Sequence, residues 1–159
     1  MFGTKIIAIV LSILIEFANN PLLITEVLAE NRSEVVIEGD YAELKADVFT
    51  LINQYRTEEG LNALEWERGM ELAATVRAKE AQELFSHTRP DGTMYWTVNS
   101  SLVYGENLSR GYNTAESIVN AWMQSESHRD NILYPEFRTV CLGVYVEDDY
   151  MTTSLLFGY

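Results

Sequence analysis

The chain has 159 residues, of which 47% are hydrophobic and 11% aromatic, enough apolar side chains for the core of one domain of ordinary size. Its 24 acidic and 11 basic residues give a formal net charge of −13, which opposes binding to nucleic acid or to anionic lipid surfaces. The single cysteine, Cys141, excludes an intramolecular disulfide, so the core must stabilise the fold.

The first 29 residues have the pattern of a secretion signal. Lys5 supplies a short positive region, residues 6–15 contain one polar side chain, and residues 27–29 form a small-residue cleavage site. Polar residues within 16–21 interrupt the apolar run before it reaches the roughly 20 residues that span a bilayer. We expect an extracellular protein, either released after cleavage or kept at the cell envelope by an uncleaved anchor; only the anchor would involve a membrane.

Residues 30–41 predict an acidic spacer, and helical periodicity begins directly after it. The apolar spacing is that of one helix face, and Gly60 provides a C-terminal stop, so we expect a first helix from Ala42 to the residues before Gly60. The residues that define this face are Val48, Leu51, Ile52 and Tyr55.

A second helical run follows Trp66 and ends near Phe85. Its apolar side is expected to face the core and its charged side to face solvent. The residues expected to point inward are Met70, Ala73, Ala74, Ala81 and Leu84. The residues expected to point outward are Arg77, Lys79, Glu80 and Glu83.

The segment from His87 to Tyr112 is rich in proline, glycine and asparagine, which indicates a long loop of the kind that carries functional residues. Asn113 then predicts the N-cap of a third helix, with Glu116 completing a capping box. The apolar side of this helix leads directly into a polar cluster that contains His128.

Two segments rich in β-branched and aromatic residues, 140–146 and 151–157, predict an antiparallel hairpin around an acidic turn. Three helices and a small sheet together indicate an α+β or layered α/β/α domain.

The only two histidines of the chain, His87 and His128, flank the tripeptide Gly105-Glu106-Asn107 in the sequence. We expect the three segments to converge on one cleft, where two imidazoles and a carboxylate could hold a divalent metal with open positions for water. Two other interpretations stay open. A histidine at a helix end can be a surface or capping group, and Ser125 with His128, three residues apart, could form a nucleophile–base pair.

Four motifs, in this order, resemble the CAP superfamily, the group of cysteine-rich secretory proteins, antigen 5 and pathogenesis-related 1 proteins. They are S-H-T-R-P-D-G at 86–92, G-E-N-L at 105–108, W-M-Q-S with H-R-D-N-I-L inside 122–133, and L-F-G at 156–158. The likeness is to the short bacterial type of this unit, also called the SCP domain. It covers the chain from about Ala46 onward, and we assign the domain to residues 42–159.

The resemblance implies an α/β/α sandwich with a small central antiparallel sheet between helical layers, and a cleft lined by His87, Glu106 and His128. Many animal and plant members have a second cleft glutamate where this chain has Ser125, so the resemblance implies a metal site of three ligands at most. The disulfides of the family are absent, and Cys141 is expected in the core as a small apolar residue.

The first functional expectation is a non-enzymatic extracellular binding module whose cleft takes a divalent metal, zinc before calcium, and a lipid, peptide or cell-surface ligand. No organic cofactor and no nucleic-acid partner are expected. The alternative is an extracellular, metal-assisted hydrolase of the protease type. In that case the candidate catalytic residues are His87, Glu106 and His128, with Glu106 as metal ligand or general base. A structural or interaction role in the cell envelope is the third possibility.

Overall fold

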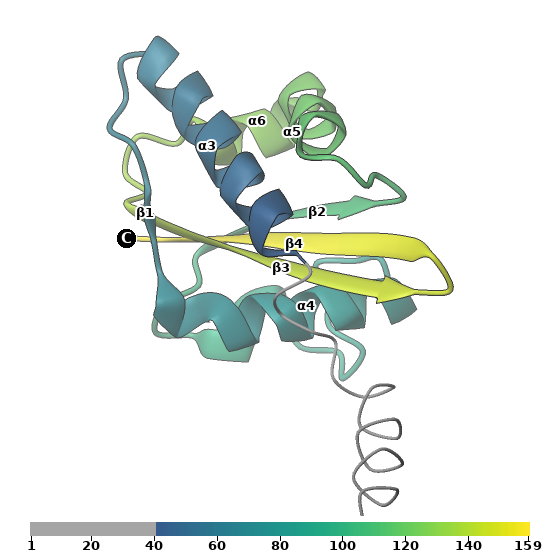
Figure 1. Cartoon of the computed structure of the whole chain (residues 1–159). Coiled ribbons are helices and arrows are strands. Elements are labelled where there is room, and N and C mark those ends of the chain that lie inside the picture. The colour runs from purple at the N-terminus through teal and green to yellow at the C-terminus, as the bar shows by residue number, and fades with distance from the viewer. Residues whose placement is uncertain (1–40) are drawn as a thin grey trace, which may run out of the picture. The chain divides into compact units, whose positions relative to one another are not determined.

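The computed structural model describes residues 41–159, so the expected signal segment and most of the acidic spacer lie outside the described residues. A sheet lies between two helical layers (Figure 1). The helix α4 (Glu71–Glu83) covers one face, and α3 (Ala42–Glu58), α5 (Ala115–Gln124) and α6 (Glu126–Ile132) cover the other. This is the α/β/α sandwich of the α+β class that the sequence predicts. Within residues 41–159, no helix is long and apolar enough to cross a membrane.

The sheet has four strands in the order β1-β3-β4-β2. The predicted hairpin is confirmed: β3 (Thr139–Glu147) pairs antiparallel with β4 (Tyr150–Gly158) along its whole length. The two turn residues, Asp148 and Asp149, have φ of 50° and 62°, the left-handed conformation that matches the twist of a tight hairpin. The short strand β1 (Glu65–Trp66) pairs parallel with β3, so the sheet is mixed rather than purely antiparallel.

The strand β2 (Gly105–Arg110) lies at the sheet edge, where the sequence predicts only a long loop. It pairs antiparallel with β4, from Gly105 opposite Phe157 to Arg110 opposite Thr152. The loop prediction was wrong because G-E-N-L-S-R has no apolar alternation. Most of the strand is buried, but polar side chains occupy its interior positions.

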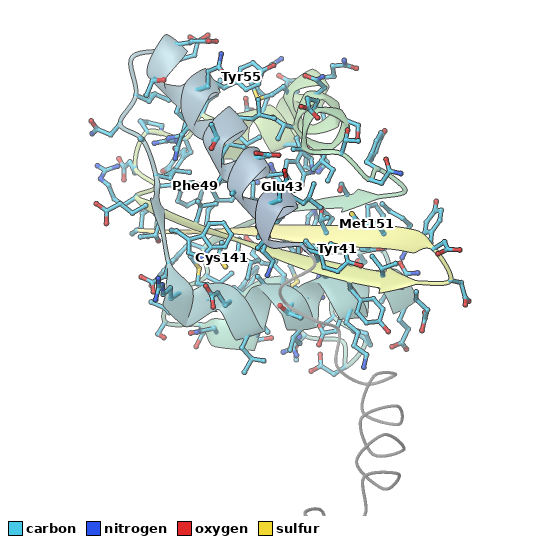
Figure 2. The ribbon with its side chains drawn as sticks, viewed as in Figure 1. Tyr41, Glu43, Phe49, Tyr55, Cys141 and Met151 are labelled. Atoms are coloured by element: carbon cyan, nitrogen blue, oxygen red, sulfur yellow. The ribbon has the colours of Figure 1, made fainter. Side chains whose placement is uncertain are left out.

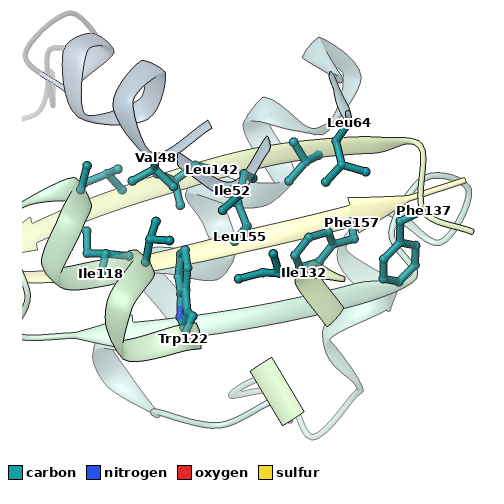
Figure 3. Packing of buried hydrophobic residues seen from close by; sticks show 14 residues of the cluster. Val48, Ile52, Leu64, Ile118, Trp122, Ile132, Phe137, Leu142, Leu155 and Phe157 are labelled. Atoms are coloured by element: carbon teal, nitrogen blue, oxygen red, sulfur yellow. The ribbon is translucent and has the colours of Figure 1, made fainter. Parts of the chain in front are cut away.

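The larger part of the core lies between the sheet and the helices α3, α5 and α6 (Figure 3). Val48 and Ile52, one helical turn apart, are fully buried, which confirms the predicted inner face of α3. Trp122 reaches from α5 to the edge strand, where its indole Nε1 donates a 2.9 Å hydrogen bond to the carbonyl of Leu108.

Arg56 fixes the end of α6 from inside the protein. Its side chain is fully buried, and Nη1 donates to the carbonyls of Ile132 at 2.8 Å and Tyr134 at 2.9 Å. A cation is favourable beside the unpaired carbonyls of a helix C-terminus. Burial lowers the pKa of Arg56, and the nearby charge of Arg138 adds to this effect.

The second part of the core lies between α4 and the opposite sheet face, where the two backbones approach closely. A Cβ atom at Gly143 would lie 1.9 Å from the carbonyl oxygen of Ala74, so only glycine fits there. Alanines on the sheet-facing side of α4, such as Ala74 and Ala78, permit this approach. Cys141 is fully buried in the same cluster, as expected (Figure 2).

Two expectations for α4 were wrong. Leu84 is 44% exposed, because the helix ends at Glu83 and Leu84 has extended backbone angles that take it off the helical face. Arg77, expected to be outward, is fully buried because it pairs with a buried carboxylate of β2.

The third helix differs from the prediction at both ends. Thr114 rather than Asn113 is the N-cap, and its side chain accepts from the backbone N–H of Ser117 in a reciprocal capping box. The helix also breaks at Ser125, which has extended backbone angles, so the polar cluster forms the separate helix α6.

Candidate functional site

The last two residues of the G-E-N motif direct their side chains to opposite faces of β2, as successive residues of a strand do. Glu106 points toward α4, where it pairs with Arg77. Asn107 points toward α6, where its Nδ2 donates a 2.9 Å hydrogen bond to the carbonyl of His128. Adjacent residues of one edge strand thus contact both helical layers, with His128 on α6 and His87 in the loop that follows α4.

The glycine of the motif is required by close packing at the start of the strand. A Cβ atom at Gly105 would lie 2.8 Å from the aromatic ring of Phe137, which is buried and stacks on Phe157. A larger residue would displace this ring or the strand, and with it the two side chains that follow.

The Glu106 carboxylate is fully buried and surrounded by hydrogen-bond donors. Its Oε1 accepts from Arg77 Nε at 2.8 Å and from Ser154 Oγ at 3.2 Å. Its Oε2 accepts from Arg77 Nη2 at 3.2 Å and lies 2.7 Å from His87 Nδ1. Both oxygens are therefore engaged by protein groups, and a buried charge of this kind is tolerated because it is paired and hydrogen-bonded.

Arg77 links this carboxylate to the loop that carries His87. Its Nη1 donates to Glu80 at 2.7 Å and its Nη2 donates to the carbonyl of Ser86 at 2.8 Å. Burial acts to lower the pKa of Arg77, but the hydrogen bonds and charges of Glu106 and Glu80 outweigh it, so the pKa is raised. The arginine stays charged and holds the loop against α4.

Glu80 extends the same network outward to Arg89, which donates to both of its carboxylate oxygens. Burial acts to raise the pKa of Glu80, but the hydrogen bonds from Arg89 and Arg77 lower it overall. The alternating charges of Glu106, Arg77, Glu80 and Arg89 run from the buried strand to the surface loop. They fix the segment from Ser86 to Arg89 at both of these residues.

His87 lies at the surface end of this arrangement, with its side chain 48% exposed. Its backbone carbonyl accepts from Tyr95 N–H at 2.9 Å, and the two rings make an edge contact at 5.8 Å. When Nδ1 donates to Glu106, the other ring nitrogen of the neutral imidazole, Nε2, carries the lone pair. In this tautomer, the contact with Glu106 leaves Nε2 of His87 as a hydrogen-bond acceptor.

His128 comes from α6 on the other side of β2 and is partly buried. Burial lowers the pKa of His128, and the charge of His87 lowers it further. His128 also borders a cavity of about 260 Å³ whose wall includes Ser125. Ser125 and His128 thus line one space, although the helix expected to carry both is broken between them.

The expected metal ligands are arranged differently from a closed metal site. Within residues 41–159, no group of three or more His, Cys, Asp or Glu side chains is placed to hold a metal ion. The Glu106 carboxylate pairs with Arg77 and contacts Nδ1 of His87. The three-ligand metal site therefore stays a prediction.

Sequence reasoning missed the two polar residues that hold the site together. Asn131 donates from Nδ2 to the Asn107 side chain at 2.9 Å and to the Glu106 carbonyl at 3.3 Å. Arg77 had a detectable signal, because it lies at helical spacing between Ala74 and Ala81 on the predicted inner face of α4. A charged residue inside an apolar stripe indicates a buried ionic partner elsewhere in the chain.

Comparison with known proteins places this geometry in a family. The chain is 33% identical over 118 residues to YkwD of Bacillus subtilis, and the alignment covers 70% of this chain and 46% of YkwD. The chain therefore spans less than half the length of that relative.

Two solved structures have the same fold. An outer surface protein of Borrelia burgdorferi has a TM-score of 0.63 at 25% identity over 74% of this chain and 93% of its own. An extracellular SCP-domain protein of Bacillus anthracis has a TM-score of 0.61 at 24% identity over 72% of this chain and 40% of its own. A model of the cysteine-rich secretory protein (CAP) family matches residues 49–157, the whole of the sandwich except its first helical turns and last residues. The chain therefore belongs to the CAP family.

Proposed function

We propose that this domain is a non-enzymatic, extracellular binding module that engages its ligand through His87 and His128 at the edge of β2. The observation that carries the proposal is the buried Glu106 carboxylate, 2.7 Å from His87 Nδ1. It turns one nitrogen of a half-exposed imidazole toward the protein and leaves the other for a ligand. An extracellular location is supported by the extracellular and outer-surface proteins that share the fold.

A divalent metal fits this arrangement with Glu106 as an outer partner rather than a direct ligand. Histidines that bind metals usually donate their second ring nitrogen to a carboxylate, which fixes the tautomer and the ring orientation. His87 and His128 would hold the ion, and imidazole pairs suit zinc better than calcium, which prefers oxygen ligands. A zinc ion held in this way would keep positions for water or for an anionic group of the bound lipid or peptide.

The alternative of metal-assisted hydrolysis is less well supported by the same observation. A general base must come within about 2.6–3.2 Å of the proton that it removes, directly or through one water. The side chain of Glu106 is fully buried and contacts Arg77, Ser154 and His87. Glu106 therefore acts as a positioning residue for His87 rather than as a base. This role supports binding rather than hydrolysis.

Zinc titration by calorimetry tests the proposal with the variants His87→Ala, His128→Ala and Glu106→Gln. Both histidine variants should lose binding, whereas loss of an outer-shell partner in Glu106→Gln should weaken it about 10- to 100-fold. Glu83→Gln is the matched control, because Glu83 makes the same change on the exposed side of α4. Zinc binding that survives when His87 and His128 are both replaced by alanine would refute the metal role. Casein turnover that disappears in Glu106→Gln would favour the hydrolase instead.

A further inference from the structure

A cavity of about 260 Å³ extends from His128 along β2 to Arg110, away from the Glu106 carboxylate. It is bordered by the segment that follows α4, by β2, by the end of α5 and by the first turn of α6. The residues that line it are Phe85, Leu108, Ser109, Arg110, Tyr112, Ala121, Trp122, Ser125 and His128.

The charge of this lining is opposite to that of the chain. None of its nine residues is an aspartate or glutamate, although the chain has 24 of them and a formal net charge of −13. Arg110 is the permanently charged member, and His128 adds a second positive charge when it is protonated. A concave site lined by one sign of charge selects a ligand of the opposite sign, so the occupant is expected to be an anion.

Arg110 is held in place at this cavity by two contacts with the end of α4. Its Nη2 donates to the backbone carbonyls of Ala81 and Gln82, and its guanidinium carbon lies 4.7 Å from the ring centre of Phe85. Both contacts are favourable for a cation, the first at a helix C-terminus and the second over an aromatic face.

The guanidinium nevertheless lacks one hydrogen bond. In residues 41–159, Arg110 Nε is the one buried side-chain nitrogen or oxygen without a hydrogen-bond partner. Buried donors are nearly always paired, so this unpaired N–H, on a side chain that lines the cavity, is available to an acceptor supplied by a ligand. The Phe85 ring that lies against this guanidinium is 48% exposed, so it is not part of the buried core.

The rest of the lining combines apolar groups with the hydroxyl residues Ser109 and Ser125, and the volume is small. Trp122 uses its indole N–H on the Leu108 carbonyl and so presents an apolar surface, next to Ala121 and the exposed ring of Tyr112. Pockets for drug-sized ligands measure about 300–1,000 Å³, so this cavity fits a smaller molecule or one terminal group of a larger one.

We propose that the cavity binds the carboxylate of a small apolar acid, with the carboxylate at Arg110 and the apolar body against Trp122. The inference rests on the proposed binding function, and it names the class of ligand that the same cleft takes beside His128. A free short acid and the C-terminal carboxylate of an apolar peptide share this chemistry.

Nuclear magnetic resonance tests the ligand class with four probes: phenylacetate, N-acetyl-phenylalanine, and the neutral amide of each. The acids should bind about tenfold or more tightly than their amides, because a charge-assisted hydrogen bond to the guanidinium is lost in the amide. The Arg110 Nε–H and Trp122 Nε1–H signals should both shift with the acids. Tighter binding of N-acetyl-phenylalanine identifies a peptide terminus and tighter binding of phenylacetate a free acid; either result supports the proposal. Equal binding of acid and amide, or no binding of either acid, overturns it.

Two pairs of variants separate the charge of the cavity from its shape. Ser125→Glu adds a carboxylate to the wall and should weaken acid binding about tenfold or more, whereas Ser125→Gln, of equal size and no charge, should not. Arg110→Gln should have the same effect as Ser125→Glu, and Arg68→Gln on the exposed surface should have none. Zinc titration of the same proteins distinguishes the two proposals. A wild-type protein that binds zinc but no acid refutes only the acid site. Arg110→Gln should bind zinc as the wild type does, whereas the histidine variants should not.

Discussion

Arg77→Met is expected to destabilise the domain strongly, because it leaves the Glu106 carboxylate buried without its cation. The Arg77 side chain is fully buried and donates to Glu106 at 2.8 and 3.2 Å, to Glu80 at 2.7 Å and to the Ser86 carbonyl at 2.8 Å. Removing one partner of a buried ion pair typically reduces the free energy of unfolding by about 3–5 kcal/mol. A domain of this size has about 5–15 kcal/mol in total, so the loss is a large fraction of it.

Urea unfolding measures this effect as a lower midpoint at an unchanged slope. The exposed Arg68→Met serves as the control and should change the free energy of unfolding by no more than about 0.5 kcal/mol. In a double-mutant cycle, Arg77→Met with Glu106→Gln should be less destabilised than the sum of the single variants, because the unpaired charge is gone. Additive effects, or a loss below about 1 kcal/mol for Arg77→Met, would refute the account of Glu106 as a buried ion-pair partner.

Three further predictions follow from the same geometry. Burial and the charge of His87 lower the pKa of His128 in the folded protein, so below about pH 6.5 the unfolded chain binds more protons than the folded chain, and stability should decline as the pH falls to the folded pKa. Metal-free wild type should therefore lose more stability between about pH 7.5 and 5.5 than His128→Gln does. An equal loss in the two proteins would contradict the lowered pKa of His128. Gly143→Ala should reduce the free energy of unfolding by about 3 kcal/mol, because its Cβ would lie 1.9 Å from the Ala74 carbonyl oxygen. The control Gly60→Ala, at a positive φ with open space around it, should cost about 1 kcal/mol. Similar losses in the two variants would show that α4 can move away from β3. Ser125→Glu should strengthen zinc binding by adding a carboxylate beside His128, whereas Ser125→Gln should not, and calorimetry that finds the two variants alike would place Ser125 outside the metal site.

The sequence was sufficient for the parts of the fold that apolar periodicity encodes. Val48 and Ile52 on α3 and the two strands of the hairpin carry a clear apolar pattern, and each is found where that pattern predicts. The four ordered motifs of the family, between residues 86 and 158, indicated the α/β/α sandwich. Apolar periodicity is a local signal, and the motifs are short runs of residues in a fixed order, so a single sequence is enough to detect both.

The parts that could not be predicted depend on contacts between distant residues. The strand β2 has polar interior side chains, and these bond to groups of α4, α6 and β4. In the case of Glu106 and Ser154, the two side chains are 48 residues apart in the sequence. No apolar alternation marks such a strand. The reversal of Arg77 from surface to core has the same cause, since its burial depends on a carboxylate 29 residues further along the chain.

The break at Ser125 also has a tertiary origin. The backbone of α6 is held by the side chains of Asn107 and Arg56, which donate to the carbonyls of His128 and Ile132. These two anchors place α6 independently of α5, so helical periodicity across the junction could not predict the orientation of His128.

The protonation of the two ring nitrogens of His87 tests the central claim most directly. Long-range ¹H–¹⁵N correlation spectra of the imidazole, recorded where the ring is neutral, report which nitrogen carries the proton. If Glu106 orients His87, Nδ1 carries the proton, Nε2 is unprotonated, and Glu106→Gln shifts this balance. A ring with its proton on Nε2, or a rapid mixture that Glu106→Gln does not change, would contradict the account.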